Sequence, residues 1–227
     1  MLVTMPTSPP LGKFILTRDA NQHLSLVCKD NSFKPFSIDF TDNKFIHRLQ
    51  AIGKHQPIAR AIGIKAEVRP KIIDATAGMG TDAILLAALG CEVTLIEQSD
   101  IVAKLLADAL ARAAINPLLN PIVARMNLLH GDSVQLIPTL PKADVIYLDP
   151  MFPTTKNTAK VKKPMQILQQ LIGHQSEETL FNTALAHADR VVLKRPKKLN
   201  LTPPKGCQVI DTKTTQYLIL MTGNKLK

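Results

Sequence analysis

The residues best suited to chemistry form the segment DPMFP at positions 149–153. The Asp149 carboxylate and the Pro150 carbonyl are two neighbouring hydrogen-bond acceptors, and proline adds no N–H of its own. Together they can hold the hydrogens of an exocyclic amine and favour a pyramidal nitrogen, whose lone pair is otherwise delocalised into the base ring. Phe152 could stack on that base, a contact worth about 1–3 kcal/mol. We therefore expect Asp149, Pro150 and Phe152 to be catalytic; the alternative is a proline-rich loop around a buried phenylalanine.

A glycine turn follows the short apolar segment that ends at Asp74. Gly78 and Gly80 allow a tight turn and a close approach of a ligand to the backbone. The helix expected to begin at Thr81 would offer free N–H groups and the positive end of its dipole to an anionic group. Glu97 ends the next expected strand, where a carboxylate can accept hydrogen bonds from both ribose hydroxyls.

This turn fits two kinds of nucleoside cofactor. The segment GMGTDA at positions 78–83 matches the dinucleotide fingerprint G-x-G-x-x-A, so a nicotinamide cofactor is one interpretation. S-adenosylmethionine (SAM) is the other, with its carboxylate near the start of the helix. A plain strand-to-helix turn is the alternative without a ligand. Asp132 could accept a hydrogen bond from an adenine amino group, unless it and Ser133 only cap the following helix.

Alternating strands and helices are expected from Lys71 onward. The expected strands are 72–74, 92–97, 126–130, 144–149 and 190–194, and a closing hairpin spans 209–222. The expected helices are 81–89, 99–115, 134–140, 164–172 and 176–188. Strands joined by helices pair in parallel, which predicts a doubly wound, mostly parallel α/β sheet with its ligands at the carboxyl ends of the strands.

The first 70 residues have a different pattern. Strand-like runs at 14–16, 24–27 and 36–40 are separated by turn-rich segments, and a helical stretch covers 45–62. We therefore expect a small β-rich N-terminal subdomain and linker over residues 1–70, followed by the α/β domain over residues 71–227.

The charge of the chain favours a polyanionic partner. Its 227 residues carry 28 basic and 18 acidic side chains, a net charge of +10. Nucleic acid is the usual partner of such a surplus, although charge can also serve solubility alone. Two stretches without acids, 150–176 and 190–205, follow expected strands. We expect phosphate contacts from six of their basic residues: Lys156, Lys160, Lys162, Lys163, Lys194 and Arg195.

Other features exclude several classes of protein. Cys28, Cys91 and Cys207 are isolated, so neither a disulfide framework nor a cysteine metal site is expected. The N-terminus has no basic start followed by an apolar run, and no apolar stretch is long enough to span a membrane. We expect a cytoplasmic protein without a metal ion.

Several segments together resemble one family. They are FIHR at 45–48, DATAG at 74–78, YLDPMFP at 147–153, VKK at 161–163 and VLKRP at 192–196. The chain is similar over about residues 36–223 to the bacterial 16S rRNA guanine-N2 methyltransferases of the RsmJ (YhiQ) family. The resemblance implies a Rossmann-like class I methyltransferase fold and SAM as methyl donor. It also implies 16S rRNA or the 30S subunit as partner, with N2 of one guanine near the 3′ end as acceptor.

The resemblance also implies which residues contact the cofactor. By motif position they are Thr81 with Asp82, Glu97 with Gln98, Asp132 with Ser133, and Asp149; Asp74, Gly78 and Gly80 complete the expected set. The chain departs from the family pattern at three positions. Arginine is expected where Thr81 and Gln98 stand, and serine where Asp132 stands, so contacts there would rest on the backbone.

Four interpretations of the function are compatible with the sequence. An RNA amino-methyltransferase is the first, and a DNA-base or protein-amide methyltransferase could use the same Asp-Pro turn. A nicotinamide oxidoreductase would need NAD, and an rRNA-binding assembly factor would bind RNA without transferring a methyl group.

Overall fold

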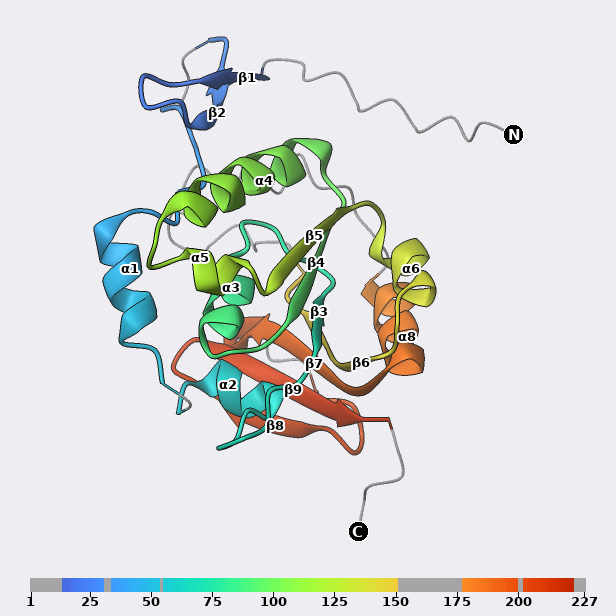
Figure 1. Ribbon diagram of the computed structural model, residues 1–227. Coiled ribbons are helices and arrows are strands. Elements are labelled where there is room, and N and C mark those ends of the chain that lie inside the picture. The colour runs from blue at the N-terminus through green and yellow to red at the C-terminus, as the bar shows by residue number, and fades with distance from the viewer. Residues whose placement is uncertain (1–13, 31–33, 54, 151–176, 200–201, 223–227) are drawn as a thin grey trace.

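The computed structural model describes residues 14–30, 34–53, 55–150, 177–199 and 202–222 of the 227-residue chain (Figure 1). Its strands are β1 (Phe14–Arg18), β2 (Leu24–Cys28), β3 (Ile72–Asp74), β4 (Val93–Glu97), β5 (Met126–His130), β6 (Ala143–Leu148), β7 (Ala188–Pro196), β8 (Gln208–Asp211) and β9 (Thr215–Met221). Its α-helices are α1 (Asn43–Gln50), α2 (Pro57–Ile62), α3 (Thr81–Ala88), α4 (Asp100–Ile115), α5 (Asn120–Val123), α6 (Ser133–Leu136) and α8 (Glu177–His187). Two 3-10 helices complete the set, η1 (Ile137–Thr139) and η2 (Lys197–Leu199).

A seven-stranded sheet with the order β5-β4-β3-β6-β7-β9-β8 forms the centre of the molecule. Strands β3 to β7 pair in parallel, while β9 runs antiparallel to both β7 and β8. Parallel neighbours require crossover connections, and here α3, α4, α6 and α8 lie within those connections. The predicted doubly wound, mostly parallel sheet and its closing hairpin are thus confirmed. The helix predicted at 164–172 lies outside the described residues.

Each face of the sheet packs against its own set of helices (Figure 1). Side chains of a strand alternate between the faces. Ile72 of β3 belongs to a core that includes residues of α1 to α5, and its neighbour Ile73 belongs to a second core with α8 and η1. Both faces are therefore apolar and covered, as a parallel sheet requires.

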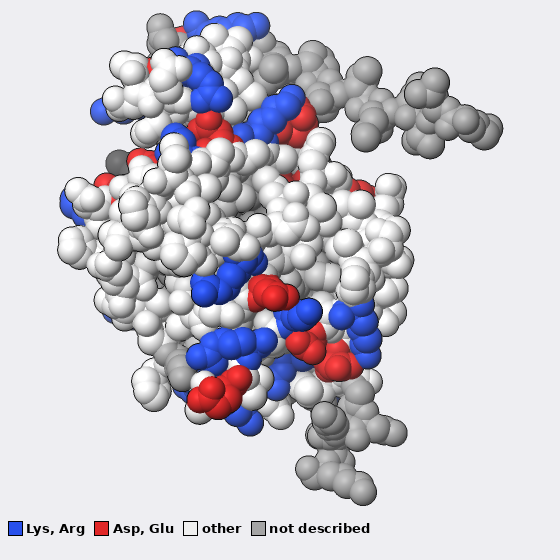
Figure 2. Space-filling view, viewed as in Figure 1, with Lys and Arg blue, Asp and Glu red and all other residues white. Residues whose placement is uncertain are grey.

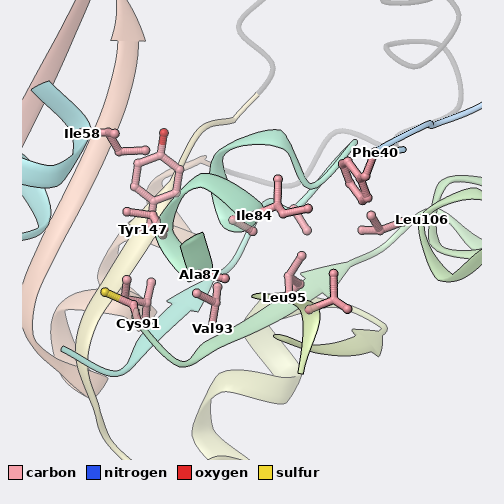
Figure 3. Close-up of a cluster of buried hydrophobic side chains, with 14 of the residues drawn as sticks. Phe40, Ile58, Ile84, Ala87, Cys91, Val93, Leu95, Leu106 and Tyr147 are labelled. Carbon is pink, nitrogen blue, oxygen red and sulfur yellow. The ribbon is translucent and has the colours of Figure 1, made fainter. Parts of the chain in front are cut away.

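The larger core surrounds the glycine turn and the end of β6 (Figure 3). Phe40 and Leu106 lie close together at one end of the cluster, with Ile84 and Leu95 beside them (Figure 3). Tyr147 is fully buried at the other end, and its hydroxyl extends beyond the ring toward polar surroundings that are described below. The packing fixes the backbone that carries the candidate site.

Strands β1 and β2 form a hairpin that lies against α4 (Figure 1). Strands β1 and β2 pair antiparallel, but the strand predicted at 36–40 is wrong. Only Phe36 pairs, through an isolated bridge to Leu26. The following residues turn toward α4 instead, where Arg112 donates hydrogen bonds to the Ile38 carbonyl and, at 2.9 Å, to the Asp39 carboxylate.

The single helical stretch predicted over 45–62 is also wrong, because the structure divides it into α1 and α2. Helix α2 begins at Pro57, which has no N–H to continue a preceding helix. Phe14, Phe40 and Ile62 share the core of the sheet strands. The domain boundary near residue 70 stays a prediction.

Among the described residues, no helix is long and apolar enough to cross a membrane. Cys28, Cys91 and Cys207 form no disulfide in the described residues, and Cys28 and Cys91 are buried.

Candidate functional site

The candidate site lies where the order of the sheet reverses. Strands β4 and β5 extend from one side of β3, and β6 and β7 from the other. Ligands of open α/β sheets bind at such a point, outside the carboxyl ends of the strands. Asp74 ends β3, Glu97 ends β4, and Asp149 directly follows β6. The structure thus brings the three predicted acids to the same edge of the sheet.

The glycine turn has the backbone conformation that its sequence predicts. Gly78 and Gly80 have φ values of 52° and 69°, in the left-handed region that favours glycine. A Cβ atom on Gly80 would also lie 2.7 Å from Cδ1 of Leu106 and 3.4 Å from Cζ of Phe40. Helix α3 begins at the next residue, Thr81, and Gly80 supplies no side chain to cap its first N–H groups. Those groups are therefore available at the candidate site.

Glu97 holds the glycine turn from the neighbouring strand. It is 3 % exposed, and its two carboxylate oxygens accept hydrogen bonds from the Gly78 N–H at 2.8 Å and the Ser99 N–H at 2.7 Å. Burial raises the pKa of Glu97, and these backbone hydrogen bonds act in the opposite direction. Each carboxylate oxygen has a further lone pair, so the anchored side chain can still accept from a ligand.

Asp132 and Ser133 both have structural partners. The Asp132 carboxylate accepts from the Val134 N–H at 2.7 Å and caps α6. Ser133 is buried, and its hydroxyl donates to the Ala75 carbonyl at 2.6 Å, which ties the start of α6 to the end of β3. Gln98 is exposed, beside Glu97. Both alternatives for Asp132, helix cap and adenine acceptor, are compatible with this position, and the adenine contact stays a prediction.

An ion-pair network joins the first turn of α3 to the Asp-Pro turn at residues 149 and 150. Lys194 of β7 directs its Nζ to Oδ2 of Asp82 at 2.6 Å and to Oδ2 of Asp149 at 2.8 Å. The Tyr147 hydroxyl donates to the same oxygen of Asp82 at 2.5 Å. The Asp149 N–H donates to Oγ1 of Thr76 at 2.6 Å, which fixes the backbone at the start of the turn.

Burial strongly perturbs the titration of these groups. It raises the pKa of Asp74 to about 8, with the nearby charges of Asp82 and Asp149 acting in the same direction. Burial also raises the pKa of Asp149, although Lys194 opposes this change. Burial alone would lower the pKa of Lys194, but Asp149 and Asp82 together raise it above its ordinary value. The cluster therefore holds a charged lysine between two aspartates, beside an Asp74 whose raised pKa favours its protonated form at neutral pH.

Replacing Asp74 by asparagine is expected to flatten the pH dependence of stability. Because the folded-state pKa of about 8 exceeds the ordinary value of 3.8, the native state keeps a proton that the unfolded chain releases. The resulting stability is fully present below pH 3.8 and is lost as the pH rises to about 8. One such proton changes the free energy of unfolding by at most about 1.4 kcal/mol per pH unit.

Urea unfolding from acidic to alkaline pH would measure this effect in the wild type, in Asp74→Asn and in a control, Asp144→Asn. Asp144 is exposed and lies at the opposite end of β6. Equal slopes for all three proteins would show that Asp74 is ionised in the native state.

Two residues predicted to contact RNA have other partners. Lys194 contacts carboxylates, as described above, instead of extending toward a phosphate. Arg195 is only 4 % exposed, and its Nε donates to the Gln216 side chain at 3.1 Å. Lys194 and Arg195 are consecutive residues of β7, so they point to opposite faces of the sheet and each meets its own partners there. The RNA contacts of both residues stay predictions.

The remaining predicted contacts, Phe152, Lys156, Lys160, Lys162 and Lys163, lie outside the described residues. Figure 2 shows basic and acidic side chains interspersed on the face in view, without one continuous basic field. Elsewhere in the described residues, charges are paired as well: Lys142 lies 2.5 Å from Asp189.

Sequence reasoning missed the roles of Thr76, Tyr147 and Lys194 in this site. The register of the structure explains the position of Lys194: Leu148 pairs with Leu193 in parallel strands, so Asp149 and Lys194 follow at adjacent positions. Among the described residues, no group of three or more His, Cys, Asp or Glu side chains could hold a metal ion. The predicted absence of a metal stays a prediction.

Comparisons with known proteins agree with this architecture. Residues 8–222 match the family of SAM-dependent methyltransferases. "Ribosomal RNA small subunit methyltransferase J" of Aeromonas hydrophila is 46 % identical over 186 residues, covering 79 % of this chain and 75 % of the relative. The protein of the same name from Dechloromonas aromatica is 44 % identical over 189 residues, with 81 % and 77 % covered.

A solved structure is similar over most of its length. The crystal structure of a SAM-dependent methyltransferase from Neisseria gonorrhoeae superposes with a TM-score of 0.68 and 31 % identity, covering 89 % of this chain and 80 % of that one. The doubly wound sheet, with its glycine turn and acids at the carboxyl ends of the strands, is a fold that binds nucleotide-like ligands at this position. The chain therefore belongs to the ribosomal RNA small subunit methyltransferase J family of SAM-dependent methyltransferases.

Proposed function

We propose that this enzyme transfers a methyl group from SAM to the exocyclic N2 of a guanine near the 3′ end of 16S rRNA. The observation that carries the proposal is the position of Asp149. It follows β6 at the point where the strand order reverses. Lys194 links it to Asp82 in the first turn of α3. The names of the relatives support small-subunit rRNA as the substrate, and such a substrate would place the enzyme in the cytoplasm.

The residues around the glycine turn suit the cofactor. SAM carries a sulfonium, an ammonium and a carboxylate group, and it supplies an electrophilic methyl when bound. The first N–H groups of α3, at Thr81 and Asp82, suit its carboxylate, whereas the acids beside them suit its positive groups. We assign the ribose to Glu97 with Gln98, and the adenine to Asp132 with Ser133. Gly78 and Gly80 let the cofactor approach the backbone closely, and Asp74 ends β3 just before this turn.

The Asp-Pro turn would act on the acceptor amine. The Asp149 carboxylate and the Pro150 carbonyl accept hydrogen bonds from the N2 hydrogens, which leaves the nitrogen lone pair free to attack. The new N–C bond forms as the C–S bond breaks, and the electron pair of the broken bond returns to sulfur. The nitrogen then loses one proton, to Asp149 or to water. Orientation and these two preorganised acceptors would provide most of the catalysis.

RNA binding in this proposal rests on the net charge of +10 and on lysines at positions 156, 160, 162 and 163. Contacts to phosphates would position the RNA without reading its sequence. Phe152 would stack on the target base.

The experiment that tests the proposal uses purified enzyme and methyl-labelled SAM. We expect label to enter unmodified 30S subunits or 16S rRNA, at N2 of one guanine when the labelled nucleotide is mapped. DNA and protein substrates serve as the other arms, because a related enzyme with the same turn could act on a DNA base or a protein amide. Label only in one of those arms would refute the proposal, and so would RNA binding without any transfer.

A further inference from the structure

Lys194 connects two parts of the candidate site that come from different segments of the chain. Asp82 belongs to the first turn of α3, on the glycine-turn side, and Asp149 belongs to the turn after β6. The Lys194 ammonium lies 2.6 Å from one carboxylate and 2.8 Å from the other. Its side chain is 24 % exposed, against 36 % for Asp149, so the acid is the more accessible of the two groups.

In the described part of the chain, the titratable groups that interact with Asp149 come from β3, α3, β6, β7 and β9. Asp74 of β3 and Asp82 of α3 are acids, and Tyr147 of β6 and Tyr217 of β9 are phenols whose titration Asp149 affects. Among the described residues in this group, Lys194 provides the positive charge. Without it, burial and the neighbouring acids would all favour the protonated form of Asp149.

Tyr147 helps to position Lys194 between Asp82 and Asp149. Its hydroxyl donates to the same Asp82 oxygen that Lys194 contacts, so that oxygen has two donors. The second donor fixes the Asp82 carboxylate in one orientation. The lysine is consequently held at a defined position, from which one N–H reaches Asp149.

We propose that Lys194 is a positioning residue, which holds the Asp149 carboxylate ionised and oriented as the acceptor for the target amine. The inference rests on the proposed function of Asp149. An ionised carboxylate accepts hydrogen bonds through both oxygens, whereas a protonated one carries a competing donor. Lys194 therefore acts through Asp149 and need not touch the RNA.

The test compares Lys194→Met, Lys194→Gln and Lys194→Arg with the wild type in single-turnover methyl transfer at saturating cofactor, across a range of pH. We expect the uncharged variants to be slower at neutral pH by about 10–100-fold, the loss seen when residues that hold metal ligands in position are replaced. Their rates should recover as the pH rises, because the pKa of Asp149 increases when the lysine charge is lost. Lys194→Arg should keep an acidic limb close to that of the wild type.

Lys142→Met is the matched control. Lys142 is exposed and pairs with Asp189. It directly precedes the first residue of β6, at the end of the strand away from Asp149, so its loss should leave the pH profile unchanged. Should Lys194→Met fail to fold, Lys194→Gln keeps the polar contact and gives the same comparison. An uncharged variant whose acidic limb coincides with that of the wild type would overturn the inference.

A second measurement separates this inference from the proposed function. Carboxyl NMR with labelled aspartate follows the titration of Asp149 in the free enzyme, without RNA. If Lys194→Gln raises the pKa of Asp149 but the wild type methylates no RNA, the proposed function fails while the role of the lysine stands. If RNA is methylated and the titration of Asp149 is unchanged, only the role of the lysine fails.

Discussion

Replacing Asp149 by alanine is expected to slow methyl transfer to RNA by at least about 10²–10³-fold, the usual effect of losing one preorganised polar group at a reacting centre. The substitution removes one of the two proposed acceptors for the target amine. It leaves Lys194 its second partner, Asp82, at 2.6 Å, so the fold should be kept. Single-turnover methylation at saturating SAM measures the chemical step apart from cofactor binding.

Two further variants define what Asp149 contributes. Asp149→Asn keeps a carbonyl acceptor but loses the charge, so its rate should lie between those of Asp149→Ala and the wild type. Asp144→Ala is the control, because Asp144 lies at the other end of β6 from Asp149 and accepts a hydrogen bond from the Lys71 N–H at 2.7 Å. This variant should retain the wild-type rate. If Asp149→Ala keeps more than about a tenth of the rate, a loss of less than 1.4 kcal/mol, the carboxylate is not the main acceptor.

Replacing Asp108 by alanine is expected to lower the free energy of unfolding by about 3 kcal/mol, as for removal of one partner from a buried ion pair. Asp108 lies on α4 with a side chain only 7 % exposed. It accepts from Arg18 at 2.7 Å, from the Leu24 N–H at 3.1 Å and from Nε of Arg112 at 2.9 Å. The substitution would leave Arg112 partly uncompensated and release the N-terminal hairpin from α4.

Chemical denaturation monitored by circular dichroism gives this value. Lys104→Ala is the control on the same helix, because Lys104 is 57 % exposed and pairs with Asp100 at 2.7 Å. Such surface pairs contribute at most about 1 kcal/mol. If Asp108→Ala costs no more than this control, the hairpin is not held by the ion pairs, and its apolar contacts, such as those of Phe14 and Leu26, must hold it.

Much of the fold and part of the site follow from local sequence patterns. The apolar runs that became β3 to β7 are separated by helical segments, and this alternation alone implies parallel pairing. The same rule brings Asp74, Glu97 and Asp149 to one edge of the sheet, because each stands at the carboxyl end of its strand. The left-handed conformations of Gly78 and Gly80 follow from the residue type, since only glycine adopts them without strain.

The tertiary structure decided what the charged side chains face. Lys194 and Arg195 belong to a basic run that suggests RNA contacts, yet one contacts two carboxylates and the other is buried against Gln216. Their partners come from distant segments, and the +10 net charge of the chain carries no information about such pairs. The same holds for residues 36–40, which have strand-like alternation: only Phe36 pairs with a strand, and Arg112 of α4 binds the Ile38 carbonyl and the Asp39 carboxylate instead. Patterns of neighbouring residues determine the backbone elements, whereas the protonation and the partner of a buried charge depend on which distant groups the packed core brings within a few ångströms.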